Sequence, residues 1–274
     1  MRRLYMPDPF YEPRALRVQS PEERLLDRLM HALLPAPCLG CGRPLPAAGA
    51  PLGLCAVCRV AFVPIPREAC AVCLRALAAH ALPEGYRCGA CRQSPPAFDR
   101  LIALWTYRPP LDAVVRGLKF GRLDYLGRHL AAALAAELGP GLAVCDQVVP
   151  VPLHWRRRLA RGYNQAERIA RPLAGRLGLP CVQALARSRA TPPQSLLGRE
   201  ERLANLRKAF RVPRPDRVRG LHVLLVDDVA TTGATLDSAA AALRKAGAAA
   251  VTALAVGRTP LEAIAGDRGK DPTE

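Results

Sequence analysis

Eight of the ten cysteines in this 274-residue chain lie in four C-x-x-C pairs, and this spacing constrains the fold of the first hundred residues. Successive pairs are separated by 13, 11 and 14 residues: Cys38/Cys41, Cys55/Cys58, Cys70/Cys73 and Cys88/Cys91. One C-x-x-C pair can place both thiolates on the same metal ion, and two pairs complete a tetrahedral shell. We therefore expect two structural zinc ions. We favour sequential over crossed pairing, a choice that the spacing alone does not fix.

Other interpretations of the cysteine pairs are disulfides, redox C-x-x-C motifs and half-filled metal sites. Disulfides need an oxidising compartment. The N-terminus has two arginines followed by prolines and Asp8, where a secretory signal would carry an apolar segment. We therefore expect a cytoplasmic protein with reduced thiols. A closed four-thiolate site serves folding and not catalysis.

The charge of the chain is concentrated in one segment. The formal net charge is +17, from 40 basic and 23 acidic residues, and only four of the basic residues are lysines. Between Arg156 and Arg219, 17 basic residues stand against 4 acidic ones, so +13 of the charge lies in 64 residues. Genomic base composition can enrich arginine throughout a chain, but such concentration favours a basic face for phosphates, nucleic acid or an acidic surface.

Half of the residues are hydrophobic and the mean hydropathy is +0.04, which is typical of a soluble globular protein. No apolar stretch approaches the roughly 18 residues of a transmembrane helix, so we expect no membrane insertion. Composition divides the chain into an arm (1–36), a zinc module (37–95), a larger domain (96–260) and a tail (261–274). Within the arm, a short helix is predicted from Ser20 to just before Pro35.

From Phe98 onward, short apolar segments alternate with segments of helical spacing, which predicts an α/β fold. The predicted strands are 101–107, 148–151, 221–226 and 248–256, and the predicted helices are 109–120, 124–138, 164–177 and 235–246. Strands that are apolar almost throughout indicate a mainly parallel sheet covered by helices on both faces. Residues 186–207 combine paired prolines with many arginines and are predicted to form a long mobile loop.

The most informative segment follows the apolar run Val223–Val226: two adjacent carboxylates, Asp227 and Asp228, and then a turn that opens a helix. Unpaired charges are costly in a core, so we expect both carboxylates at the strand's carboxyl end, where open α/β sheets bind ligands. The turn, Thr231-Thr232-Gly233-Ala234-Thr235, offers helix N-terminal amides and three hydroxyls to a phosphate.

Carboxylates beside such a turn can accept hydrogen bonds from vicinal hydroxyls or hold Mg²⁺. Together these features predict a ribose 5-phosphate site. The alternative is an ordinary βα turn in which Asp228 helps to cap the helix.

The order Asp-Asp-x-x-Thr-Thr-Gly-x-Thr resembles the phosphoribosyl pyrophosphate (PRPP) signature of type I phosphoribosyltransferases. Further segments resemble the ComF family: residues 149–166, 191–194 with Arg199, Arg202 and Asn205, and Leu118-Lys119-Phe120. The resemblance covers roughly residues 37–258. It implies a type I phosphoribosyltransferase fold preceded by a double zinc ribbon. It also implies PRPP binding, with Mg²⁺, by Asp227, Asp228, Thr231, Thr232, Gly233, Ala234 and Thr235.

By the same resemblance, the loop after strand 148–151 is the pyrophosphate loop, and residues 186–207 correspond to the flexible loop of the fold. Four arginines follow that strand: Arg156, Arg157, Arg158 and Arg161. Guanidinium groups grip diphosphate oxygens in bidentate fashion, so we expect these arginines to bind pyrophosphate or another polyanion. The alternative is a solvated run of charge.

The ComF resemblance implies a protein that handles single-stranded DNA in natural transformation, with PRPP, DNA and components of the competence machinery as partners. We favour this function, with a retained PRPP site. The alternative is an active phosphoribosyltransferase with an unknown acceptor. An amidophosphoribosyltransferase is disfavoured because Met1 is followed by Arg2 and not by the N-terminal catalytic cysteine of its glutaminase half.

Overall fold

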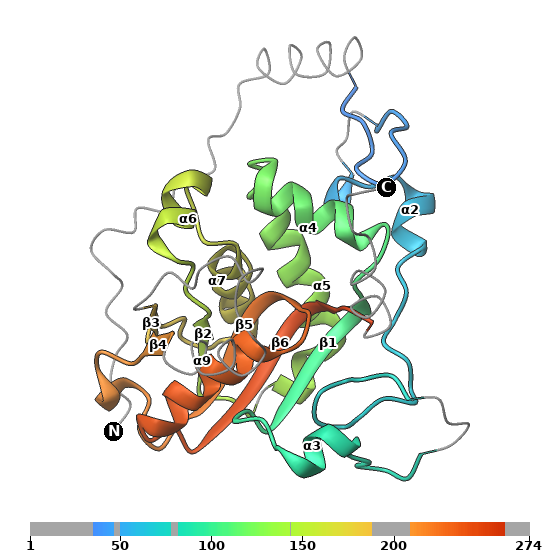
Figure 1. Ribbon diagram of the computed structural model, residues 1–274. Helices are drawn as coiled ribbons and strands as arrows, with labels where there is room; N and C mark the ends of the chain where they lie inside the picture. The colour runs from blue at the N-terminus through green and yellow to red at the C-terminus, as the bar shows by residue number, and fades with distance from the viewer. Residues whose placement is uncertain (1–34, 47–49, 78–81, 143, 188–208, 261–274) are drawn as a thin grey trace, which may run out of the picture.

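The computed structural model describes residues 35–46, 50–77, 82–142, 144–187 and 209–260 (Figure 1). The helix predicted from Ser20 lies outside these ranges, as does most of the loop predicted at 186–207. Within them, no helix has both the length and the apolar character needed to cross a membrane.

Helices and strands alternate along the second half of the chain, as the sequence predicts. Three short helices precede the sheet: η1 (Pro51–Gly53), α2 (Ala56–Val60) and α3 (Gly89–Gln93). The remaining elements are β1 (Arg100–Thr106), α4 (Leu111–Phe120), α5 (Leu126–Leu142), β2 (Gln147–Pro150), α6 (Trp155–Arg161), α7 (Gln165–Leu177), β3 (Ala186–Arg187), β4 (Phe210–Arg211), η3 (Pro215–Arg217), β5 (His222–Ala230), α9 (Ala234–Lys245) and β6 (Ala250–Arg258).

Four strands form a parallel sheet in the order β1-β6-β5-β2, and β3 pairs with β4 in a separate antiparallel ribbon. Alternate residues of β5 face opposite sides of the sheet. Val223 and Leu225 pack with α9, whereas Leu224 and Val226 pack with α4, α5 and α7. Both faces are therefore covered, which confirms the predicted α/β class.

Local sequence explains where the helices begin and how closely they pack. The Asn164 side chain accepts a hydrogen bond from the Ala166 amide (3.2 Å) and caps α7, which ends at Gly178 in the left-handed region. Gly127 in α5 lies against α7 so closely that a Cβ there would approach the Arg168 carbonyl oxygen to 2.4 Å. Only glycine permits this helix contact.

Two expectations from the sequence were wrong. β5 does not end at Val226, because its backbone pairing with β6 continues to Ala230 opposite Arg258. Asp227 and Asp228 therefore belong to the strand. The segment after β2 is not a loop throughout, because residues 155–161 form α6.

The two cysteine segments extend the two faces of the sheet. Leu52 and Leu54, beside the first four cysteines, belong to the apolar cluster of α4 and α5. Val72, beside the second four, belongs to the cluster of α9. Figure 1 shows α2 and α3, which carry cysteines of the two segments, at separate ends of the molecule. Each cysteine segment therefore packs against a different side of the same sheet.

Candidate functional site

The turn between β5 and α9 contains the threonines and the glycine that the sequence predicts for a phosphate-binding turn. Thr231 and Thr232 are exposed, and Gly233 adopts a φ of 84° as the residue before α9. This left-handed conformation suits glycine and directs the chain into the helix. The Thr232 hydroxyl accepts a hydrogen bond from the Ala234 amide (3.3 Å). The next amides belong to the first helical turn, where N–H groups have no partner within the helix and favour an anion.

The acidic pair lies at the carboxyl end of β5, beside this turn. Asp228 is buried, with 4% of its surface exposed, and faces α4. Its Oδ1 forms an ion pair with Lys119 Nζ at 2.9 Å. Its Oδ2 is buried without a hydrogen-bond partner in the described residues. A buried carboxylate oxygen without a partner is suited to accept a hydrogen bond from a hydroxyl group or to bind a cation.

Asp227 has a different environment from Asp228, because successive strand residues point to opposite faces. Burial and the neighbouring charge of Asp228 raise the pKa of Asp227 from 3.8 to about 7. The Asp228 amide donates to its Oδ1 (2.8 Å), which opposes that rise. A nearby cation or hydroxyl donor would therefore favour the ionised form of the Asp227 carboxyl.

A basic pocket of about 310 Å³ adjoins the acidic pair through Lys119. It is lined by the ends of α4 and α6 and the loops after them: Lys119, Phe120, Arg122, Arg157, Ala160, Arg161 and Tyr163. The Arg161 guanidinium lies over the Phe120 ring at 4.7 Å. The Tyr163 hydroxyl donates to the Leu118 carbonyl (2.5 Å), which joins the segment after α6 to α4. The pocket thus combines four cationic groups with two aromatic rings.

The four predicted arginines do not act as one group. Arg157 and Arg161 line the basic pocket, whereas Arg158 lines a smaller cavity with Asn164 and Glu167. The Arg156 side chain is outside the described residues. Burial lowers the pKa of Arg161, and the negative charge of Asp228 offsets part of that shift. α6 therefore directs arginines of one run to different sites.

The eight paired cysteines form two tetrads in sequence order. Within each tetrad the Sγ atoms lie within 4.8 Å of one another: Cys38, Cys41, Cys55 and Cys58 in the first, and Cys70, Cys73, Cys88 and Cys91 in the second. Cys41 and Cys55 Sγ are 3.7 Å apart, and Cys73 and Cys88 Sγ are 3.8 Å apart. A tetrahedral site with Zn–S bonds of about 2.3 Å has sulfur separations of about 3.8 Å.

The cysteine thiols of each tetrad have strongly shifted pKa values, in both directions. Burial alone would raise the pKa of Cys38, but the amides of Cys55, Cys41 and Gly40 outweigh it and lower the value to about 6. The amides of Cys88, Cys73 and Val72 likewise lower the pKa of the buried Cys70 to about 6. Burial and its cysteine neighbours raise the pKa of Cys58 to about 12. Ionising all four thiols of a tetrad therefore needs a metal cation, and zinc fits the donor set.

Known proteins share both the domain and most of the chain. Residues 161–263 match the family described as "Phosphoribosyl transferase domain". The "DNA utilization protein YhgH" of Salmonella typhi is 39% identical over 225 residues, covering 76% of this chain and 97% of that protein. "Competence protein F" of Haemophilus influenzae is 31% identical over 202 residues, covering 71% of this chain and 86% of that protein. This chain belongs to the ComF family.

"Competence protein ComFC" of Bacillus subtilis is 34% identical over a shorter stretch of 103 residues, 38% of this chain and 40% of that protein.

The structure also brings to the candidate site residues that the sequence analysis did not assign to it. Lys119 and Arg122 come from α4 and the loop after it, far from Asp228 in sequence. Leu118-Lys119-Phe120 carried a family resemblance, but only packing of α4 on the sheet places Lys119 at the acidic pair.

Proposed function

We propose that this ComF-family protein binds Mg²⁺-PRPP at the carboxyl end of β5 and holds single-stranded DNA on the adjoining basic pocket. Its role would be DNA utilisation of the kind named for its relatives, in the cytoplasm and with competence proteins as partners. The observation that carries the proposal is the position of Lys119, which pairs with Asp228 and also lines the basic pocket.

The chain's own residues supply the binding chemistry for PRPP. The turn from Thr231 to Thr235 would receive the 5-phosphate, and Asp227 and Asp228 would accept the ribose hydroxyls. Arg157 and Arg161 are placed to neutralise the pyrophosphate. Bound Mg²⁺ would offset the repulsion between the diphosphate and the two carboxylates. Two zinc ions in the cysteine tetrads would stabilise the fold.

The basic pocket has the composition of a single-strand binding surface. The Phe120 side chain lines the pocket and is 70% exposed. Trp155, at the start of α6 and two residues before the pocket residue Arg157, is 59% exposed. Exposed aromatic rings stack bases without sequence preference, and arginines follow the phosphates. Four cations at the pocket, without an acidic residue in its lining, favour a polyanion over a neutral peptide.

A salt titration of oligonucleotide binding, with and without Mg²⁺-PRPP, tests the proposal. Each phosphate contact contributes about −0.7 to the slope of log affinity against log salt. Arg157→Ala and Arg161→Ala, each made singly, should flatten that slope and weaken PRPP binding. Arg158→Ala is the matched control for each, because it also removes one positive charge from α6 but lies outside the basic pocket. Equal effects of the control would contradict the assignment of the pocket, and undiminished PRPP affinity in Asp227→Asn with Asp228→Asn would exclude the acidic pair.

The alternative is a phosphoribosyltransferase, favoured by the pocket beside the acidic pair, which has room for an acceptor. Pyrophosphate release would be measured over purine and pyrimidine bases. Base-dependent release without DNA binding at low salt would establish a plain transferase and overturn the DNA-handling proposal.

A further inference from the structure

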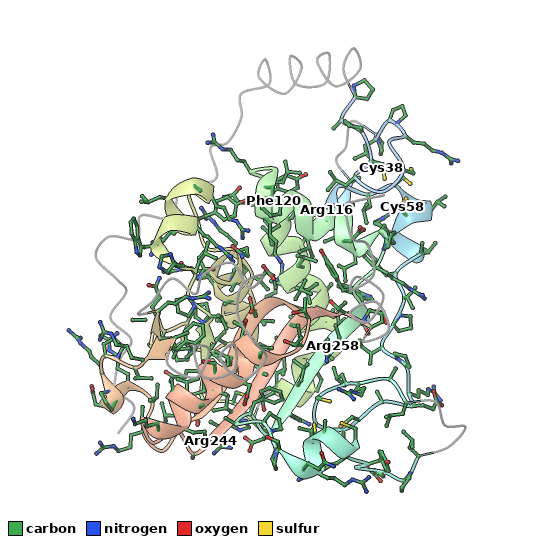
Figure 2. All side chains as sticks on the ribbon, viewed as in Figure 1. Cys38, Cys58, Arg116, Phe120, Arg244 and Arg258 are labelled. Carbon is green, nitrogen blue, oxygen red and sulfur yellow. The ribbon has the colours of Figure 1, made fainter. Side chains whose placement is uncertain are left out.

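Arg258, the last residue of β6, is a buried cation at the carboxyl end of the sheet, with 4% of its surface exposed (Figure 2). Its Nε donates to the Cys73 carbonyl at 3.1 Å, and its Nη1 donates to the Ala230 carbonyl at 3.0 Å. Nη1 also lies 3.4 Å from the Thr259 carbonyl. One guanidinium therefore connects three backbone segments, those of Cys73 and Ala230 and its own.

Two of these segments belong to sites described above. Cys73 is a member of the second cysteine tetrad. Ala230 is the last residue of β5. It directly precedes the turn Thr231–Thr235, which we call the phosphate turn. Its carbonyl also accepts the Thr259 amide at 3.0 Å, so two donors fix the point where the turn begins.

The charge of Arg258 needs compensation, because an isolated buried cation is costly. Arg258 takes part in none of the ion pairs found among the described residues. Burial lowers the pKa of Arg258 and Arg75 reinforces this, whereas the Cys73 and Cys91 thiols, when ionised, oppose it. A tetrad of four thiolates with one divalent ion carries a net charge of −2 and would supply the missing counter-charge.

We propose that Arg258 is a positioning residue that joins the second cysteine tetrad to the phosphate turn, so that metal loading of this tetrad sets the affinity of the turn for phosphate. The proposal rests on the proposed function of the turn. It distinguishes the two metal sites: the second tetrad acts on the ligand site through Arg258, whereas the first packs on the opposite face of the sheet.

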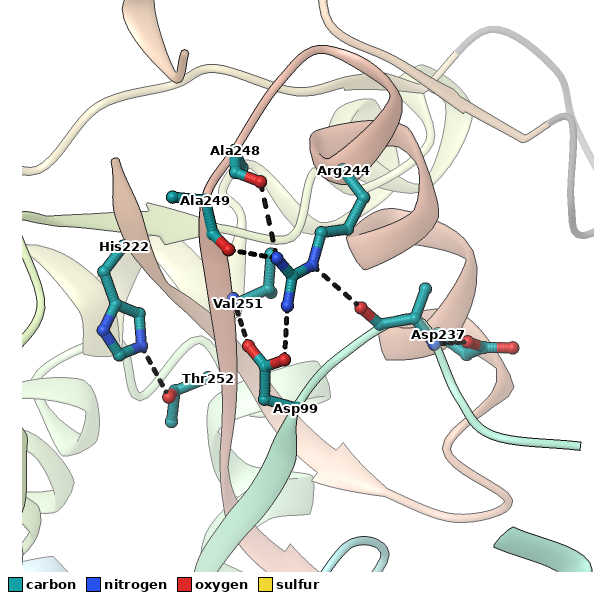
Figure 3. Close-up of polar contacts among 9 residues, drawn as sticks. Asp99, His222, Asp237, Arg244, Ala248, Ala249, Val251 and Thr252 are labelled. Atoms are coloured by element: carbon teal, nitrogen blue, oxygen red, sulfur yellow. Dashed lines mark hydrogen bonds and ion pairs between the residues drawn. The ribbon is translucent and has the colours of Figure 1, made fainter. Parts of the chain in front are cut away.

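Arg244, in the last turn of α9, provides a control of the same residue type (Figure 3). It also bridges backbone carbonyls, those of Ala97, Ala248 and Ala249, and it pairs with Asp99. These contacts lie before the amino ends of β1 and β6, opposite the phosphate turn. Its removal should therefore lower stability without altering the turn.

The test combines hydrogen exchange of the Thr231–Thr235 amides with calorimetry of Mg²⁺-PRPP binding, on zinc-loaded full-length protein. Arg258→Met should speed exchange at the turn and weaken PRPP binding about tenfold, as expected for lost hydrogen bonds from a charged donor. Arg258→Lys keeps the charge and should restore part of both effects. Arg244→Met should change PRPP affinity by less than about twofold, because it is distant from the turn.

Metal dependence separates coupling from a general loss of stability. Cys91→Ser should reproduce the effects of Arg258→Met at the turn, and combining the two should add little. Cys58→Ser, in the first tetrad, should leave exchange at the turn unchanged. Unchanged exchange in both Arg258 variants, or equal effects of Cys58→Ser and Cys91→Ser, would overturn the proposal. If wild-type protein fails to bind PRPP, the proposed function fails, while hydrogen exchange still decides whether Arg258 holds the turn.

Discussion

Lys119 is the residue on which the buried charge of Asp228 depends. It reaches from the last turn of α4 to the end of β5, and 22% of its side chain is exposed. A buried ion pair adds little net stability, but removing one partner is strongly destabilising. The remaining charge then stays buried without compensation. Lys119 therefore contributes to the stability of the fold by compensating the charge of Asp228.

Replacing Lys119 with Met leaves Asp228 without its cation. We expect the free energy of unfolding to fall by about 1–3 kcal/mol, the cost of an unsatisfied buried group. Denaturant titration measures this change. Lys245→Met, at an exposed position in α9, is the control and should stay within about 0.5 kcal/mol of wild type. Similar losses in the two variants would show that the ion pair contributes nothing specific.

The pKa of Asp227 predicts a pH dependence. Its value rises from 3.8 to about 7 on folding, so between these values the folded state holds the extra proton. The contribution of Asp227 to stability is therefore full below pH 4 and is lost as pH rises to about 7. Asp227→Asn should remove this part of the slope of unfolding free energy against pH.

Asp216→Asn, at an exposed position in η3, is the control and should keep the slope. The affinity for ligand should depend on pH in the opposite sense to stability, because Mg²⁺ and hydroxyl donors bind the ionised carboxylate. Affinity for Mg²⁺-PRPP should rise through pH 7. A wild-type slope in Asp227→Asn would refute the assignment of the titrating group.

At the scale of elements, the turn before α9 depends on one backbone conformation. Gly233 has a φ of 84° and no atom within 4 Å of where a Cβ would stand. Gly233→Ala therefore meets no clash but must adopt a left-handed conformation, at a cost of about 1–2 kcal/mol. We expect weaker phosphate binding and lower stability, measured by calorimetry and denaturation. Gly175→Ala, also in open space but helical, should be neutral or stabilising by up to about 1 kcal/mol.

The sequence predicts elements whose signal is local and misses those that depend on packing. α7 was predicted correctly because its apolar residues repeat at helical spacing, with Asn164 as its cap. α6 was missed because it has no buried apolar face: Leu159 is 75% exposed. The end of β5 was misplaced because pairing with β6, and a lysine from α4, permit charge inside the strand. Neither contact can be read from a single segment.

At the scale of the whole molecule, the cysteine tetrads lie on opposite faces of one sheet. Cys70, Cys88 and Cys91 belong to the apolar cluster that includes Leu101 and Leu225, whereas Cys38 belongs to the cluster of the other face. A metal ion bound to either tetrad would therefore stabilise an apolar cluster that includes residues of the sheet. The boundary near residue 95 stays a prediction, but the packing indicates that the cysteine segments and the sheet stabilise one another.

Metal removal tests this coupling. Metal analysis should find two zinc ions per chain, and chelation should lower the melting temperature of the whole protein, because emptied tetrads expose apolar surface and four repelling thiols each. Hydrogen exchange should then show increased opening at β6 and α9 when the second tetrad is emptied by Cys91→Ser. Cys58→Ser should instead increase opening at α4 and α5, whose cluster includes Cys38 and packs against Cys55 and Cys58. A zinc-free protein with unchanged melting temperature would contradict the metal assignment, and opening confined to residues before β1 would show that the sheet is stable without the metal sites.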